Sequence, residues 1–128
     1  MNILLDTQAF LWAVADSSKL TERAREVFYN PQNSLYFSAA SYWEICIKMS
    51  LGKLRLQKGW KKVIDKEMSI NSIKWLKLKK EHMVRLLYLP WLHDDPFDRM
   101  LVAQAQMEKC AILTPDSQIA QYDVQTIW

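Results

Sequence analysis

The stretch Ile3-Leu4-Leu5-Asp6 decides the fold. Three branched aliphatic residues in succession, without alternating polar ones, predict a short strand that is buried on both faces. Residues 7–15 are mostly apolar and predict a helix directly after this strand. Asp6 therefore lies at the carboxyl end of the strand, where open α/β sheets bind their ligands. It either caps the following helix or belongs to a functional site, and this stretch alone leaves both interpretations open.

Two later apolar runs have the same form. Leu35-Tyr36-Phe37 ends at Ser38, and Ala111-Ile112-Leu113 ends at Thr114, with Asp116 two residues further on. Each run is short, apolar and followed by a polar residue, as a buried strand of a parallel sheet is. In a parallel sheet these polar residues meet at one edge.

Helical segments separate the apolar runs. Helices are expected over residues 7–15, 21–30, 39–50, 60–68 and 80–89 and in a segment that begins at Pro96, and weaker strand candidates cover residues 70–78 and 124–128. Strands that alternate with helices, without hairpin signals, predict an α/β fold with a central parallel sheet between two helical layers. The length predicts a single domain over residues 1–128.

The composition excludes several classes of protein. Half of the 128 residues are hydrophobic, and the two cysteines, Cys46 and Cys110, lack the spacing of a zinc site or a disulfide scaffold. No apolar stretch approaches the roughly 20 residues that span a bilayer, and residues 1–6 lack the basic segment of a signal peptide. We therefore expect a cytoplasmic globular protein without a membrane anchor.

The net charge of +3 conceals an uneven distribution. Of the 17 Lys and Arg residues, eleven lie between Lys48 and Lys80, beside only two acids. A basic middle joined to an acidic remainder is typical of a protein that binds and cuts a polyanion, although a solvated basic face gives the same pattern. The candidate contacts to the phosphates of such a polyanion are Lys48, Lys53, Arg55, Lys61 and Lys62.

Acidic residues gather where the predicted strands end. Asp6 and Asp116 follow strands, and Glu44 and Asp98 lie in the early turns of two helices. Two such charges about 4 Å apart repel each other by roughly 4 kcal/mol at an effective dielectric constant near 20. A divalent cation removes this penalty, and carboxylates without a His or Cys set favour Mg²⁺ or Mn²⁺. An ion of this kind activates water and hydrolyses phosphodiesters.

Each acid also has a purely structural interpretation. Glu44 completes a capping-box pattern with Ser41. The acids within residues 94–98 complement a helix macrodipole, and Asp116 suits a turn. The acids are therefore functional candidates as a set rather than one by one.

The residues around the acids have expected roles as well. Ser38 and Thr114 are expected to orient carboxylates or waters through their hydroxyl groups, and Arg99 is expected to pair with one of the acids. His93 is expected to be a hydrogen-bond partner in its loop rather than a metal ligand, and His82 is expected to be structural. The aromatic residues divide into expected core positions and candidates for base stacking: Trp12, Trp43 and Phe97 in the first group, Trp60 and Trp91 in the second.

Several motifs taken together resemble a known family. In chain order they are Leu4-Leu5-Asp6-Thr7-x-Ala9-x-Leu11-Trp12, Ser38-Ala39-Ala40-Ser41-x-Trp43-Glu44-Ile45, Leu51-Gly52-Lys53-Leu54, and Asp95-Pro96-Phe97-Asp98-Arg99 with Ala103-Gln104-Ala105. The combination resembles the PIN-domain ribonucleases, and within them the VapC-type toxins of type II toxin–antitoxin pairs. Each motif alone is weak, but their shared order along one short chain is specific.

This resemblance implies a PIN-like three-layer α/β/α sandwich with a central parallel sheet. The family's acids fall on Asp6, Glu44, Asp98 and Asp116, which would hold Mg²⁺ or Mn²⁺. The ion would activate the water that cleaves RNA, leaving a 5′-phosphate and a 3′-hydroxyl. Thr7, Ser38 and Thr114 would support these acids. The resemblance also implies a homodimer and a small cognate antitoxin that blocks the active-site groove.

The sequence departs from the family pattern at two places. Gln8 stands where close relatives often have His, and Pro115 precedes the fourth acid. Because position 8 is not one of the acids, we expect no loss of metal binding from the first departure. The proline affects the exit of the strand before Asp116.

Two alternative functions belong to other classes. A strand-end Asp is also the nucleophile of phosphoacceptor and phosphatase domains, but those phosphatases typically have a second acid two residues later, where this sequence has Gln8. The other alternative is a PIN-like domain that binds RNA or a protein without cleavage. Four intact acids count against it, because their repulsion serves no purpose without a cation.

Overall fold

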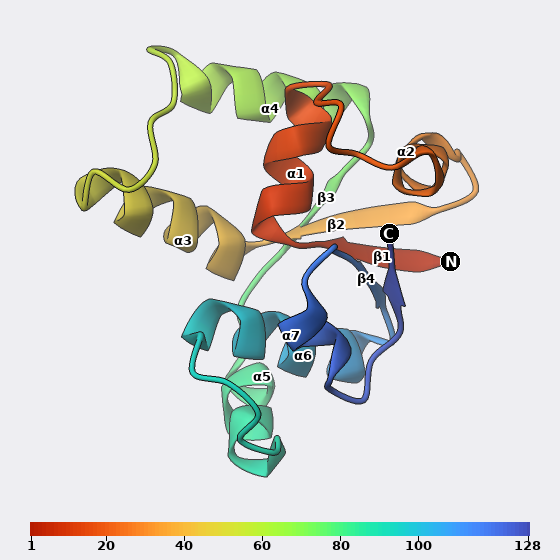
Figure 1. The fold of residues 1–128 in the computed structure, drawn as a ribbon, viewed down its shortest axis with the longest axis vertical. Helices are drawn as coiled ribbons and strands as arrows, with labels where there is room; N and C mark the ends of the chain where they lie inside the picture. The colour runs from red at the N-terminus through yellow and green to blue at the C-terminus, as the bar shows by residue number, and fades with distance from the viewer.

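Five short strands form a parallel sheet at the centre of the molecule (Figure 1). The computed structural model describes residues 1–128. In spatial order the strands are β3 (Lys74–Leu76), β2 (Ser34–Ser38), β1 (Asn2–Leu5), β4 (Ala111–Leu113) and β5 (Thr126–Ile127), and every neighbouring pair is parallel. The parallel sheet expected from the sequence is confirmed.

The strand order reverses direction at β1. From β1 the chain forms β2 and β3 on one side of the sheet, and it then crosses back to form β4 and β5 on the other side. β1 and β4 are paired from Ile3 opposite Ala111 to Leu5 opposite Leu113. The crevice beyond the strand ends at such a reversal is where open α/β sheets bind ligands. Asp6 leaves β1 at this crevice.

Seven α-helices and one 3₁₀ turn connect the strands. They are α1 (Thr7–Val14), α2 (Glu22–Tyr29), α3 (Ala39–Ser50), α4 (Trp60–Ile70), α5 (Lys80–Arg85), the 3₁₀ turn η1 (Leu86–Tyr88), α6 (Pro96–Glu108) and α7 (Ser117–Ala120). None of these helices combines the length and the apolar character that crossing a membrane requires.

The sheet is buried on both faces. Because side chains alternate along a strand, Ile3 and Leu5 belong to one hydrophobic core, where they join Phe10, and Leu4 belongs to a second core that contains Leu101. Figure 1 shows α1, α2 and α4 on the first face and α5, α6 and α7 on the second. The architecture is therefore the expected three-layer α/β/α sandwich.

Three predicted elements differ most clearly in extent from the observed ones. The edge strand expected within residues 70–78 is limited to Lys74–Leu76, because α4 continues to Ile70 and Ser72 turns the chain with a φ of 53°. The helix expected over residues 80–89 tightens into η1 after Arg85, and the last strand has two residues instead of five. All three differences concern the ends of elements and leave the strand order unchanged.

The expectation that Trp43 lies in the core is wrong. Its side chain is 57% exposed, and it contacts the edge of Phe97 with the ring centroids 5.3 Å apart. The buried face of α3 consists of Ala40, Ser41, Glu44 and Ile45. Seen along the helix axis, Trp43 lies outside the arc that these four residues form, and it therefore points to solvent.

Candidate active site

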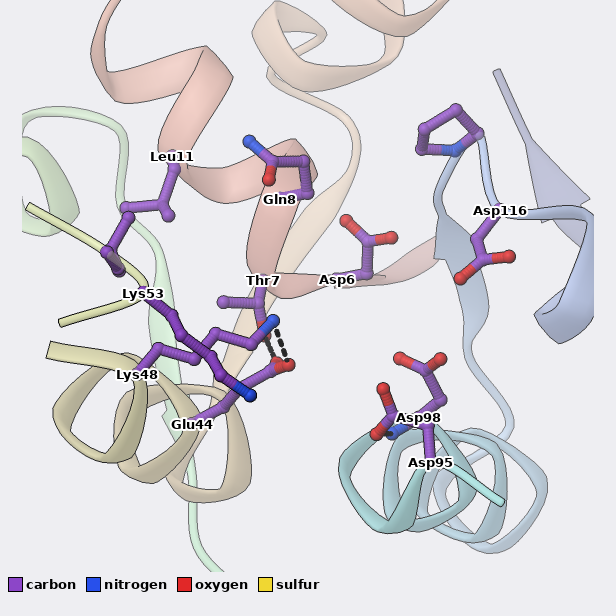
Figure 2. Close-up of a pocket in the computed structure, with 12 residues that line it drawn as sticks. Asp6, Thr7, Gln8, Leu11, Glu44, Lys48, Lys53, Asp95, Asp98 and Asp116 are labelled. Carbon is purple, nitrogen blue, oxygen red and sulfur yellow. Dashed lines mark hydrogen bonds and ion pairs between the residues drawn. The ribbon is translucent and has the colours of Figure 1, made fainter. Parts of the chain in front are cut away.

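A pocket of about 440 Å³ opens beyond the carboxyl ends of β1 and β4. Five acids from four segments of the chain line it, together with two lysines from α3 and the loop after it: Asp6, Glu44, Asp95, Asp98 and Asp116, with Lys48 and Lys53. Figure 2 shows Asp6, Asp98 and Asp116 directed toward one space, with Glu44 across from them beside Lys48. All four acids singled out in the sequence therefore face a common pocket.

Asp6 is both a helix cap and a pocket carboxylate. Its Oδ1 accepts a hydrogen bond of 2.6 Å from the backbone N–H of Ala9, and its Oδ2 accepts one from the hydroxyl of Thr114. The residue is only 6% exposed. Burial raises the pKa of Asp6 to about 6, with the negative charges of Asp116 and Glu44 adding to the increase. The helix-cap interpretation is confirmed, and the same carboxylate also lines the pocket.

Asp98 lies in the first turn of α6, and its pKa is raised further than that of Asp6. Burial raises the pKa of Asp98 to about 7, and the nearby charges of Asp95, Asp116 and Glu44 act in the same direction. The hydrogen bond between its Oδ2 and Nε2 of His93, 3.1 Å long, opposes this rise. Desolvation and crowded negative charge both disfavour an ionised Asp98, and a bound cation would reverse that balance.

Two further acids of the pocket cap helices. Asp116 caps α7 by accepting a hydrogen bond of 2.8 Å from Gln118, and its own N–H bonds to the Thr114 hydroxyl. Asp95 caps α6, since its Oδ1 accepts from the N–H groups of Phe97 and Asp98. The role of Asp95 was not decided by the sequence, and the structure places it at the pocket wall.

Glu44 has an environment unlike that of the aspartates. Its Oε1 accepts a hydrogen bond of 2.5 Å from the Thr7 hydroxyl, and its Oε2 lies 2.8 Å from the Lys48 ammonium. The capping-box interpretation of Glu44 is wrong, because α3 begins at Ala39 with Ser38 as its cap and the buried Ser41 hydroxyl has no partner. The Glu44-x-x-x-Lys48 spacing, which favours an ion pair on a helix, is the sequence signal that reveals this contact.

Two residues that were expected to contact the acids, Ser38 and Arg99, do not contact them. The Ser38 hydroxyl donates to Oε1 of Gln104 over 2.5 Å and caps α3, so it contacts no carboxylate. Arg99 pairs with no acid either, because its guanidinium donates to the Pro90 carbonyl and to the Tyr122 hydroxyl. Both residues are buried, and their polar partners are Gln104 of α6 for Ser38 and the loop residues Pro90 and Tyr122 for Arg99.

The predicted RNA-binding cations divide into two groups. Lys48 and Lys53 line the pocket, whereas the exposed Arg55, Lys61 and Lys62 lie outside its lining. Of the aromatic candidates for base stacking, Trp60 packs against the core and Trp91 is 73% exposed. Lys48 forms an ion pair with Glu44, whereas Arg99, which was expected to pair with an acid, does not.

The donor set suits a hard cation. No three His, Cys, Asp or Glu side chains lie close enough together to hold a metal ion by themselves. Mg²⁺, however, usually retains several waters and binds through one or two carboxylates. Carboxylates that share a pocket and have raised pKa values therefore fit such an ion in ligand type and in charge.

The comparisons with known proteins identify the family. A family model of the PIN domain matches residues 3–125. The chain belongs to the PIN-domain family. No curated protein matches it significantly. The three-layer sandwich described above is thus the PIN-like fold expected from the sequence.

Solved structures share this PIN fold over nearly the whole chain. A chain of VapBC2 from Rickettsia felis, bound to a DNA fragment from its promoter, has a TM-score of 0.74 at 12% identity, with 99% of this chain and 98% of that chain covered. VapBC-1 from nontypeable Haemophilus influenzae gives 0.68 at 17% identity, with 99% and 97% covered. A toxin–antitoxin complex from Klebsiella pneumoniae gives 0.64 at 14% identity, with 98% and 96% covered. At these identities the likeness concerns the fold.

Proposed function

We propose that this PIN domain is a metal-dependent endoribonuclease that acts as the toxin of a toxin–antitoxin pair. The observation that supports it most directly is the pair Asp6 and Asp98, two carboxylates whose pKa values are raised by burial, which face one pocket without a Lys or Arg side chain bonded to either. A protein gains nothing in stability from such a pair. Perturbed acids in a pocket at a topological switch point are typical of a functional site.

Asp6, Asp98 and Asp116 would hold Mg²⁺ or Mn²⁺, with Asp116 as an outer or water-mediated ligand and Glu44 as a further ligand or the group that positions water. When bound, the ion lowers the pKa of water and stabilises charge on a phosphodiester. Thr114 fixes the direction of Asp6 through its hydroxyl. Thr7 and Lys48 fix Glu44 in the same way.

Lys48 and Lys53 would bind the phosphates of RNA at the pocket. They lie across the pocket from Asp98, so phosphates bound in the pocket would have positive charge on one side and aspartates on the other (Figure 2). Arg55, Lys61 and Lys62 would extend this basic surface away from the pocket. Such contacts act through charge and carry no base specificity.

The proposed partners are a small antitoxin and a second copy of the chain. The structurally similar chains come from complexes described as VapBC or toxin–antitoxin. Exposed apolar side chains cluster on α5, on η1 and in the loop after it, at Val84, Leu87, Tyr88 and Trp91. Exposed apolar clusters of this kind mark protein–protein contacts. We place the assembled pair in the cytoplasm.

The alternative is a PIN domain that binds RNA or protein without cleavage. It requires no cation at the acids, whereas the ribonuclease does. A melting temperature that rises with Mn²⁺ concentration would support the ribonuclease by mass action. A melting temperature that does not change would favour the alternative.

The test is cleavage of single-stranded RNA by the purified chain with Mg²⁺ or Mn²⁺, with and without a chelator. We expect cleavage that the chelator abolishes and that Asp6→Asn and Asp98→Asn each remove. Asp123→Asn is the matched control, because Asp123 is exposed and outside the pocket lining. Undiminished cleavage by both pocket variants would overturn the proposal.

A further inference from the structure

Arg99 is a buried cation without an acidic partner. It is 5% exposed, and a guanidinium in such a position is ordinarily paired with a carboxylate. Here its Nη1 donates to the Pro90 carbonyl over 2.9 Å and to the Tyr122 hydroxyl over 3.0 Å. The ring of Trp91 lies 4.2 Å from the guanidinium carbon. The positive charge of Arg99 is therefore directed at the oxygen of Tyr122.

The bond from Arg99 favours one direction for the next two hydrogen bonds. Because the Tyr122 oxygen accepts from Arg99, its own hydrogen is free for Nδ1 of His93, which lies 2.8 Å away. A neutral imidazole that accepts at Nδ1 has its hydrogen on Nε2. Nε2 of His93 lies 3.1 Å from Oδ2 of Asp98 and so donates to it.

We infer that His93 and Tyr122 are positioning residues for Asp98. Arg99 is the fixed charge that sets the direction of this chain of hydrogen bonds from Arg99 through Tyr122 and His93 to Asp98, which we call the relay. The relay holds the His93 ring in the Nε2–H tautomer and fixes Oδ2 of Asp98, which leaves Oδ1 without a hydrogen bond from the protein and free for the pocket. In such a chain each bond polarises the next and strengthens it. The catalytic part of this inference rests on the proposed function, since Asp98 is there an active-site acid.

The relay connects parts of the chain that are distant in sequence. His93 lies in the loop before α6, Asp98 and Arg99 lie in α6, and Tyr122 follows α7. Tyr122 is buried and its ring packs against that of His93 at 5.4 Å. A purely structural aromatic residue would satisfy the packing without its hydroxyl. Removing only that oxygen therefore separates positioning from packing.

The tautomer is tested without reference to activity, by ¹⁵N NMR of the two imidazoles at about pH 8, where an ordinary histidine is neutral. We expect the Nε2–H form for His93, and a mixture of tautomers in Tyr122→Phe. His82 is the internal reference, because its Nδ1 accepts from the Lys79 backbone N–H in a separate part of the molecule. An Nδ1–H tautomer of His93 in the wild type, or an unchanged signal in Tyr122→Phe, would overturn the inference.

The consequence for the site is tested with Mn²⁺ binding by calorimetry and with RNA cleavage. Removal of a partner that orients a metal-binding residue typically costs 10- to 100-fold in affinity or activity. We expect Tyr122→Phe to weaken Mn²⁺ binding and to lower kcat by roughly 10-fold with KM for RNA unchanged. Tyr29→Phe is the control, because Tyr29 is exposed at the end of α2 and its hydroxyl makes no hydrogen bond to the protein.

His93 variants provide the rescue experiment. The amide N–H of His93→Gln can replace the donor at Nε2, whereas His93→Ala removes it, so the Gln variant should retain more Mn²⁺ affinity than the Ala variant. Equal loss in both, or a Tyr122→Phe protein within twofold of wild type in both Mn²⁺ affinity and kcat, would overturn the positioning role. A wild type that binds Mn²⁺ without cutting RNA would contradict the proposed function instead, and the tautomer and the Mn²⁺ affinities would then decide this inference alone.

Discussion

The two walls of the pocket hold their carboxylates in opposite ways. On the α3 wall, Glu44 accepts from Thr7 and forms an ion pair with Lys48, so its negative charge is compensated within the protein. On the facing wall, Asp98 has one hydrogen bond from a histidine and several acidic neighbours, and its pKa is raised to about 7. Asp6, between the walls, is buried with its pKa raised to about 6.

The ionised form of Glu44 is stabilised by groups of the protein, whereas the ionised forms of Asp6 and Asp98 lack a positive charge beside them. Lys48 already supplies Glu44 with a positive charge. Asp6 and Asp98 have no such partner, and burying an uncompensated charge is costly. Groups that lower the folding stability of a protein are typically found where it binds a ligand. The comparison therefore predicts that a cation acts mainly on the aspartate side.

The largest expected effect is on Mn²⁺ affinity. Asp98→Asn removes an uncompensated carboxylate and should weaken Mn²⁺ binding by at least about 100-fold, the upper end of the cost for partners outside the ligand shell. Glu44→Gln removes a carboxylate that Lys48 already neutralises and should cost less than about 10-fold. Calorimetric titration of both variants measures the difference. Equal losses would show that the two walls bind the ion alike.

The second prediction concerns stability without metal and its dependence on pH. The folded-state pKa of Asp98 is raised above the unfolded value of 3.8, so the wild type loses stability as the pH rises through about 7. Asp98→Asn lacks this loss and should be about 2 kcal/mol more stable than wild type near pH 8, after allowance for solvent screening. The difference should shrink as the pH falls and vanish only below the unfolded-state pKa of 3.8, where the group is protonated in both the folded and the unfolded protein.

Urea denaturation from about pH 5 to pH 8 in a chelating buffer measures this difference. Glu44→Gln is the control, and it should show no such gain at high pH because its charge is paired with Lys48. If the stability difference between Asp98→Asn and wild type did not grow with pH, the pKa of Asp98 would not be raised in the folded protein and the interpretation would be wrong.

The positions of Asp6 and Asp116 at the pocket could be predicted from sequence because they follow from the topology of the sheet. Apolar runs that end in Asp6 and near Asp116 place both residues at the carboxyl edge once the sheet is parallel, and the register of β1 with β4 confirms that edge. The fold was predictable for the same reason, since buried strands have a continuous apolar pattern. Periodicity and strand ends thus determined most of the architecture.

The α3 wall and the relay behind α6 could not be predicted in the same way. Whether Glu44 closes a capping box or bonds to Lys48 depends on where α3 begins, and helix ends are the least certain feature of a sequence pattern. Arg99 was expected to pair with an acid, but the Tyr122 hydroxyl, 23 positions away, occupies it. Contacts between distant polar side chains leave no periodic signal in one sequence.

The third prediction removes the compensation on the α3 wall. Lys48→Met leaves Glu44 buried without its positive partner and should lower stability by about 1 kcal/mol, a modest amount because Lys48 is half exposed. Mn²⁺ should then restore more stability than it gives to the wild type, since Glu44 now behaves like the aspartates. Thermal melting with and without Mn²⁺ measures both changes. Lys53→Met, which breaks no ion pair, is the control, and identical behaviour of the two variants would contradict the role of Lys48.

The smallest expected effect is on the salt dependence of RNA binding, and it distinguishes the pocket lysines from the outer ones. Lys53 lines the pocket, whereas Lys61 is exposed on α4 outside it. Each lost phosphate contact on a single strand lowers the slope of log affinity against log salt by about 0.7, because fewer counterions are released. Lys53→Ala should show this decrease in full, and Lys61→Ala only part of it, when binding to a short RNA is titrated in the chelating buffer at several salt concentrations. A larger decrease for Lys61→Ala would move the main RNA contact from the pocket to α4.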